Sequence, residues 1–185
     1  MLSSKQAYDI FATVLVYASN MVKIDLQTHT DTELIERLMD SAFGAARHGR
    51  SVWLLRSVPP VPDLCLVLRE ADAMLASLRF WEVLLERETV LLLGPLAVQP
   101  ELRGQGYGQL IVTDGLARAR AIGKWPLVLV SGEPDYYPKF GFVPATPFQV
   151  EWPGFVEPER LQFLELRRGA LAALRPPLRV RAINA

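Results

Sequence analysis

The chain has 185 residues, of which 50% are hydrophobic and 22% are charged. This length and composition are typical of one folded domain with a sizeable core and exclude a disordered chain. Lysine plus arginine and aspartate plus glutamate balance at 20 each, so there is no overall positive charge of the kind that gathers nucleic acid.

The single cysteine, Cys65, excludes an internal disulfide, and the two histidines lack metal-ligand spacing. We therefore expect no bound metal and a reducing, cytoplasmic location. Residues 9–19 are apolar, but they are shorter than the ~20 residues of a membrane span and lack the flanks of a signal peptide. We predict that residues 1–20 form an N-terminal extension, that residues 21–185 form a single domain, and that this domain does not bind a membrane.

The first predicted elements are a strand and a helix. MVKIDL (21–26) has the composition of a strand, and residues 28–44 have helical periodicity. Thr30 and Glu33 stand in capping-box spacing at the start of that helix. Its predicted apolar face consists of Leu34, Ile35, Leu38, Met39 and Ala42.

A βαβ unit is predicted in the second half of the chain. Apolar segments at 64–69, 73–86 and 89–98 are joined by short separators, which indicates antiparallel hairpins. From about Gln105 to Ile122 the pattern is helical, and residues 126–130 form a short, fully apolar strand typical of parallel pairing. The chain therefore predicts a mixed α/β (α+β) domain with antiparallel strands before the βαβ unit.

A glycine-rich loop, RGQGYG at 103–108, lies at the first turn of that unit. Such a turn binds anions because the first helical amides are unpaired and the helix dipole favours negative charge, and Arg103 adds a fork suited to phosphate. The spacing differs from both the P-loop and the dinucleotide motif G-x-G-x-x-G. The glycines alone leave two interpretations open, a phosphate-binding loop or tight helix–strand packing.

The segment LGPLAVQPELRGQGYGQLIVTDGLARARAIG resembles the acetyl-CoA-binding core of the GNAT N-acetyltransferase superfamily. Residues 103–108 match its [Q/R]-x-x-G-x-[G/A] signature after a strand that ends V-x-P. YYPKFGF (136–142) resembles the tyrosine–x–x–x–Gly–Phe segment that follows the fifth strand of that fold. The resemblance covers about residues 21–166 and implies a GNAT-like fold with an acetyl-CoA-binding βαβ core.

The resemblance also implies how acetyl-CoA is bound. The fourth strand would splay from the fifth at Gly94-Pro95, where proline cannot donate to the ladder. The pantetheine arm would then bond to main-chain groups, and the glycine-rich loop would hold the pyrophosphate. The residues so assigned are Leu96, Ala97, Val98, Arg103, Gly104, Gln105, Gly106, Tyr107 and Gly108.

Tyr137 is the predicted catalytic residue. Acetyl transfer needs a proton for the departing thiolate, and a tyrosine hydroxyl suits that role. Tyr137 stands four residues before Gly141, the position at which GNAT enzymes carry their general acid; Tyr136 is the second candidate. Either tyrosine is otherwise a core aromatic with a satisfied hydroxyl.

No motif in the sequence identifies the general base or the acceptor. No base is assigned, and Trp81 or Trp152 is a candidate wall of the acceptor pocket. The asparagine that many GNAT proteins place after the fifth strand is missing from SGEPD (131–135). The carboxylates near the predicted site, each more often a solvated group than a base, are Glu82, Glu86, Glu88, Glu133 and Asp135.

The resemblance implies an acetyl-CoA-dependent N-acetyltransferase that transfers acetyl directly to a primary amine. The acceptor is either a small-molecule amine or a protein amine, and the resemblance allows a homodimer. Two alternatives stay open: a catalytically silent CoA-binding sensor or structural module, and a nucleotide-phosphate-binding domain.

Overall fold

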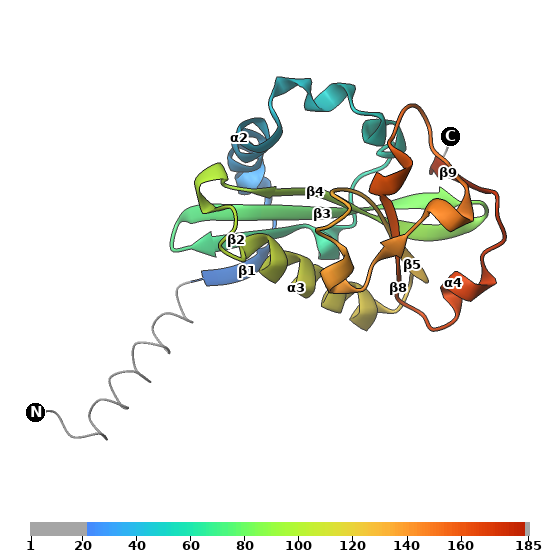
Figure 1. The fold of residues 1–185 in the computed structure, drawn as a ribbon. Coiled ribbons are helices and arrows are strands. Elements are labelled where there is room, and N and C mark those ends of the chain that lie inside the picture. Colours follow the sequence, from blue (N-terminus) through green and yellow to red (C-terminus); the bar gives the residue numbers. More distant parts are fainter. Residues whose placement is uncertain (1–21, 184–185) are drawn as a thin grey trace, which may run out of the picture.

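A mixed nine-stranded sheet organises the chain, with the strand order β1-β2-β3-β4-β5-β8-β6, while β9 pairs with β3 and β7 pairs with β9 (Figure 1). The computed structural model describes residues 22–183, so the predicted extension 1–20 lies outside the described residues. The helices and strands are β1 (Val22–Leu26), α2 (Thr32–Phe43), β2 (Leu66–Glu70), β3 (Ala73–Leu85), β4 (Glu88–Val98), α3 (Tyr107–Ile122), β5 (Leu127–Ser131), β6 (Val143–Pro144), β7 (Val150–Glu151), β8 (Leu161–Glu165), α4 (Ala170–Ala173) and β9 (Leu178–Ala182).

The predicted topology is confirmed. Strands β1 to β4 pair antiparallel in sequence order, and β4 pairs parallel with β5 after the crossover through α3. The crossover helix begins at Tyr107 rather than at Gln105, because Gly106 adopts a left-handed backbone (φ +89°) that ends the preceding turn. Gly123, also left-handed, ends the helix where the sequence predicts.

The two long helices cover opposite faces of the sheet (Figure 1). Helix α2 packs on one face through Ile35, Leu38 and Met39, which are buried as predicted. Leu34, by contrast, is exposed, so the apolar face of α2 is narrower than the sequence predicts. Helix α3 packs on the other face, where Gly115 lets it approach β3.

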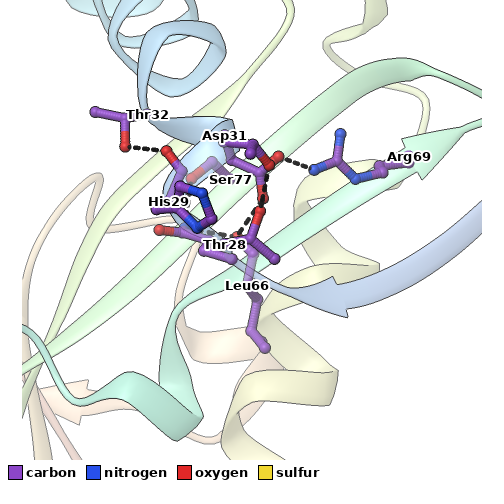
Figure 2. Close-up of polar contacts among 9 residues, drawn as sticks. Thr28, His29, Asp31, Thr32, Leu66, Arg69 and Ser77 are labelled. Carbon is purple, nitrogen blue, oxygen red and sulfur yellow. Dashed lines mark hydrogen bonds and ion pairs between the residues drawn. The ribbon is translucent and has the colours of Figure 1, made fainter.

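The start of α2 corrects the predicted capping box. The box is formed by Thr28 and Asp31, not by Thr30 and Glu33, since a 3-10 turn (His29–Asp31) precedes the helix. Asp31 accepts a hydrogen bond from the Thr28 amide (2.8 Å) and pairs with Arg69 of β2 (Figure 2). Burial alone would raise the pKa of Asp31, but the bonds from Thr28 and Arg69 lower it below its ordinary value. The cap is thereby fixed to the sheet.

Strand β3 is shared by two parts of the sheet. On one edge its first half pairs with β2 and its last residues, Val83–Leu85, pair with β9. A second core cluster lies there, around Trp81, Leu92 and Phe163.

Within residues 22–183 no helix combines the length and the apolar character that crossing a bilayer requires.

We predict that Gly115→Val lowers the free energy of unfolding by about 2 kcal/mol, because it overpacks the α3–β3 contact. A Cβ at Gly115 would lie 2.8 Å from the ring of Phe80 and 3.1 Å from Leu78, and both neighbours are fully buried. Ala117→Val, on the exposed face of the same helix, should cost only about 0.5 kcal/mol. Urea unfolding of both variants measures the difference, and equal losses would contradict the close contact.

Candidate active site

The central feature of the site is the point at which β4 leaves β5. The two strands pair only between Leu91–Leu93 and Val128–Val130. Beyond Gly94-Pro95, β4 stays paired with β3 through Leu96, Ala97 and Val98. The other edge of this part of β4 therefore has no strand partner within the described chain. The parallel pair therefore ends where the GNAT resemblance implies that the fourth strand leaves the fifth.

The glycine-rich loop follows directly and provides a second set of free backbone groups. Gly104 and Gly106 have left-handed backbones (φ +80° and +89°), and a Cβ at either would meet open space. No side chain caps α3, and the first amides of a helix cannot bond to intrahelical carbonyls. These two glycines are thus required by their backbone conformation, and the surface above them is open.

Gly108 has a different physical role. A Cβ there would lie 2.7 Å from the hydroxyl of Tyr136 and 3.3 Å from Val98. Tyr136 therefore reaches across to the first turn of α3 only because residue 108 has no side chain. Lys139 lies 4.4 Å from the ring centroid of Tyr136 on the same side of the site.

Tyr137 is held in place by close packing. It is 7% exposed, and its ring packs edge-on against Phe142 and Tyr136. A Cβ on Gly132 would lie 2.1 Å from the Tyr137 ring, so the ring occupies space that only glycine leaves free. Burial, with a smaller contribution from Tyr136, raises the pKa of Tyr137 well above that of free tyrosine. Its hydroxyl is therefore protonated at neutral pH.

One cleft of ≈ 1200 Å³ contains almost all of the predicted site residues. The structure brings Tyr136 and Tyr137 together with the open stretch of β4 and the glycine-rich loop. The predicted residues that line the cleft are Leu96, Ala97, Val98, Arg103, Gly104, Gly106, Tyr107, Gly108 and Tyr137. Gln105 does not line it, because its side chain turns back to donate to the Glu101 carbonyl (3.3 Å).

Of the five predicted candidate carboxylates, only Glu133 lines the cleft. Its carboxylate accepts from Arg160 at 2.7 Å. Glu82 binds Lys124 and the Trp125 indole, both at 2.7 Å; burial alone would raise its pKa, but these bonds lower it. The other two carboxylates that line the cleft, Glu36 and Glu157, also lie next to arginines.

The opposite wall of the cleft was not predicted from the sequence. It consists of residues 47–56, between α2 and β2, and residues 154–157, after β7. The two segments are tied together: Ser51 donates to the Phe155 carbonyl (2.6 Å) and accepts from Trp152 (2.9 Å). Trp53, rather than Trp81 or Trp152, is the tryptophan that lines the cleft. No local pattern in the sequence marks this wall, since residues far apart in the chain form it.

Comparisons with known proteins agree with this geometry. A crystal structure of the GNAT family N-acetyltransferase YhbS from Escherichia coli in complex with CoA is 25% identical, covers 89% of this chain and 91% of that one, and superposes with a TM-score of 0.73. The chain has the fold of this GNAT enzyme. An acetyl-CoA complex of a GNAT family acetyltransferase from Brucella melitensis, 23% identical with a TM-score of 0.64, covers 88% of this chain and 96% of that one and has the same fold.

A curated relative points to the same family. The uncharacterized N-acetyltransferase YjhQ of Escherichia coli K12 is 30% identical over 121 residues, which is 63% of this chain and 66% of the relative, just under two thirds of its length. No protein-family model matches the sequence. The relatives are thus acetyltransferases, and two of them hold CoA or acetyl-CoA, in agreement with the prediction of an acetyl-CoA-dependent N-acetyltransferase.

The residues present fit acetyl-CoA. A free strand edge, an open glycine loop at a helix N-terminus and Arg103 supply donors for a long anionic ligand. Among the residues that the structure describes, no three histidine, cysteine, aspartate or glutamate side chains come together as metal ligands.

We predict that Gly132→Ala displaces the Tyr137 ring and lowers the free energy of unfolding by about 1–3 kcal/mol, because the new Cβ overlaps the ring. Gly49→Ala is the matched control, since a Cβ there meets nothing within 4 Å. Thermal unfolding and near-ultraviolet circular dichroism compare the two variants. An unchanged tyrosine signal in Gly132→Ala would show that the ring does not depend on this glycine.

Proposed function

We propose that this protein acetylates a primary amine, using acetyl-CoA as the acetyl donor and transferring the acetyl group directly. The observation that carries the proposal is the single cleft in which an unpaired strand edge, a glycine-rich helix N-terminus and a buried tyrosine meet. The CoA and acetyl-CoA complexes of its GNAT relatives support the choice of co-substrate.

Two parts of the chain bind the co-substrate in this proposal. Main-chain groups of Leu96, Ala97 and Val98 bond to the pantetheine arm, as a third strand would bond to the open edge of β4. Amides of the loop from Arg103 to Gly108 bind the pyrophosphate, and Gly104 and Gly106 let the backbone approach it. The Arg103 guanidinium, which donates to the Ala42 carbonyl at 3.0 Å, lies at the edge of this loop.

Tyr137 is the general acid in this proposal. Acetyl-CoA supplies an activated thioester whose sulfur leaves as a thiolate when the amine attacks the carbonyl carbon. The Tyr137 hydroxyl holds the proton that this sulfur receives. Burial keeps that hydroxyl protonated, and packing against Gly132 and Phe142 fixes its direction. The hydroxyl of Tyr136, by contrast, is directed to Gly108 at the start of α3.

Water, rather than a carboxylate, takes the proton from the amine. Within the described chain the three carboxylates that line the cleft each lie within 4 Å of an arginine, and the Glu36–Arg47 and Glu133–Arg160 distances are 2.7 Å. An arginine nitrogen at hydrogen-bond distance takes up a carboxylate oxygen that would otherwise accept the proton of the amine. Ordered water can carry the proton to bulk solvent.

The acceptor is a small-molecule or protein amine, and the amine-acetylating names of the relatives support only that class. A single buried thiol, Cys65, whose pKa burial raises, suits a reducing cytoplasm. The homodimer stays a prediction.

Calorimetric titration with acetyl-CoA tests the function. We expect a dissociation constant near micromolar, about −8 kcal/mol, and no comparable binding of ATP or NAD. Equal binding of ATP would favour a nucleotide-phosphate-binding domain. Tight binding of acetyl-CoA without thiol release in the presence of any amine of a broad panel would favour a silent CoA-binding module.

We predict that Tyr137→Phe lowers kcat by ~10²–10⁴-fold and leaves the dissociation constant of acetyl-CoA unchanged, because only the proton donor is removed. Tyr136→Phe is the matched control and should lower kcat less than tenfold. A larger loss in Tyr136→Phe would move the general acid to that residue. Release of CoA thiol with an accepting amine measures both variants.

We predict that kcat/KM of the wild type rises with pH up to about 10, as the acceptor amine (pKa ~10) loses its proton. A general acid acts only below its own pKa, and the pKa of Tyr137 is raised, so no fall should appear in this range. A descending limb between pH 8 and 9.5 would contradict the assignment of Tyr137.

A further inference from the structure

Three arginines gather at the Gly94 end of the cleft, opposite the glycine-rich loop. Arg50 and Arg56 belong to the unpredicted wall, and Arg79 lies on β3 beside the point where β4 leaves β5. An Nη atom of Arg56 lies 3.7 Å from the position of a Cβ on Gly94. The cluster is therefore beside the strand opening in which the thioester is proposed to lie.

None of these three arginines has a carboxylate partner within residues 22–183. Arg56 packs its guanidinium 4.5 Å from the ring centroid of Trp53 and 5.6 Å from that of Trp81. Arg79 donates only to the neutral amide of Gln27 (2.8 Å). The other two arginines deep in the cleft differ, because Arg47 and Arg160 each lie next to two carboxylates.

Buried donors without acceptors lie at the same place. The Nε of Arg56 and the indole Nε1 of Trp81 are both buried, and neither has a hydrogen-bond partner in the described part of the chain. A buried donor without an acceptor costs about 1–3 kcal/mol, and more when it is charged. Burial, and then repulsion by Arg79 and Arg50, lowers the pKa of Arg56 to about 10. An anion bound here would accept from Arg56 and balance its charge, so both the cost of the unpaired donor and the repulsion among the arginines would fall.

We propose that Arg50, Arg56 and Arg79 form an oxyanion-binding subsite for the acceptor, so that the acceptor is an amine that carries a carboxylate or phosphate group. This inference rests on the proposed function, which assigns the opposite end of the cleft to acetyl-CoA. The phosphates of acetyl-CoA already have the loop amides and Arg103. The three arginines are thus left for a second anionic ligand.

The remaining lining indicates an apolar body on the same acceptor. Leu54 and Phe155 are 62% and 85% exposed, and with Trp53 they line the cleft beside the cluster. A large apolar residue that is so exposed gains from covering by a ligand. Aryl oxyanions are therefore the probes of choice.

The test is equilibrium binding to the protein saturated with CoA, which occupies the phosphate-binding loop. Benzoate and phenyl phosphate are titrated, with neutral benzamide as the isosteric control, and calorimetry and tryptophan fluorescence report binding because Trp53 and Trp81 contact Arg56. We expect at least one of the two anions to bind about tenfold or more tightly than benzamide. The stronger of the two distinguishes a carboxylate from a phosphate acceptor.

Charge-removing variants locate the subsite. Arg56→Gln and Arg79→Gln should each weaken binding of the preferred anion about tenfold and leave CoA binding unchanged. Arg87→Gln, an exposed arginine in the β3–β4 turn, is the matched control and should bind the anion as the wild type does. Urea unfolding first establishes that each variant is folded. If one of the two cluster variants does not fold, the other one tests the subsite.

The outcomes separate this inference from the proposed function. Equal binding of benzamide and the anions, no anion binding at millimolar concentration, or unchanged anion affinity in both cluster variants would overturn the subsite. None of these results depends on turnover. A wild type that binds the anion at the cluster but does not bind or use acetyl-CoA would overturn the proposed function and leave the subsite established.

Discussion

The separation of β4 from β5 is the constraint on which the site depends. The parallel pair ends at Leu93, where Gly94 takes a left-handed backbone (φ +119°) and Pro95 has no amide to donate. Strand β4 continues along β3 but leaves one edge unpaired. The glycine-rich loop, the two tyrosines and the arginine cluster all line the cleft that includes this edge. A continuous β4–β5 pair would close the cleft.

Glycines, which have no side chain, make room for the aromatic rings around this opening. Gly115 admits the Phe80 ring between α3 and β3, Gly108 admits the Tyr136 hydroxyl, and Gly132 admits the Tyr137 ring. In each case an added Cβ would lie less than 3 Å from an aromatic side chain. Because packed interiors have little free volume, these contacts hold the rings in single positions. The same packing that stabilises the fold thus orients the proposed acid.

Charge divides the cleft into two ends. Seven arginine and lysine residues and three glutamates line it, although the whole chain is neutral. Arg103 and Lys139 lie at the loop end, which suits the phosphates of a CoA co-substrate. Arg50, Arg56 and Arg79 lie at the Gly94 end, and the glutamates lie next to other arginines. Local charge, rather than net charge, therefore indicates which ligands this protein binds.

The sequence by itself determined the parts whose signal is local. Apolar periodicity and glycine at the turn predicted the βαβ unit. The GNAT resemblance of the segments around Gly94-Pro95 and Tyr137 implied the break in β4 and a tyrosine at the site. The tertiary structure decided what depends on contacts between distant residues. Thr28 and Asp31 form the capping box of the 3-10 turn before α2, and Asp31 also pairs with Arg69 on β2. The Tyr137 ring occupies the space above Gly132, and residues 47–56 meet residues 154–157 to form the second wall. Periodicity and motif spacing report only neighbours along the chain, whereas these pairs are brought together by the packing of the sheet.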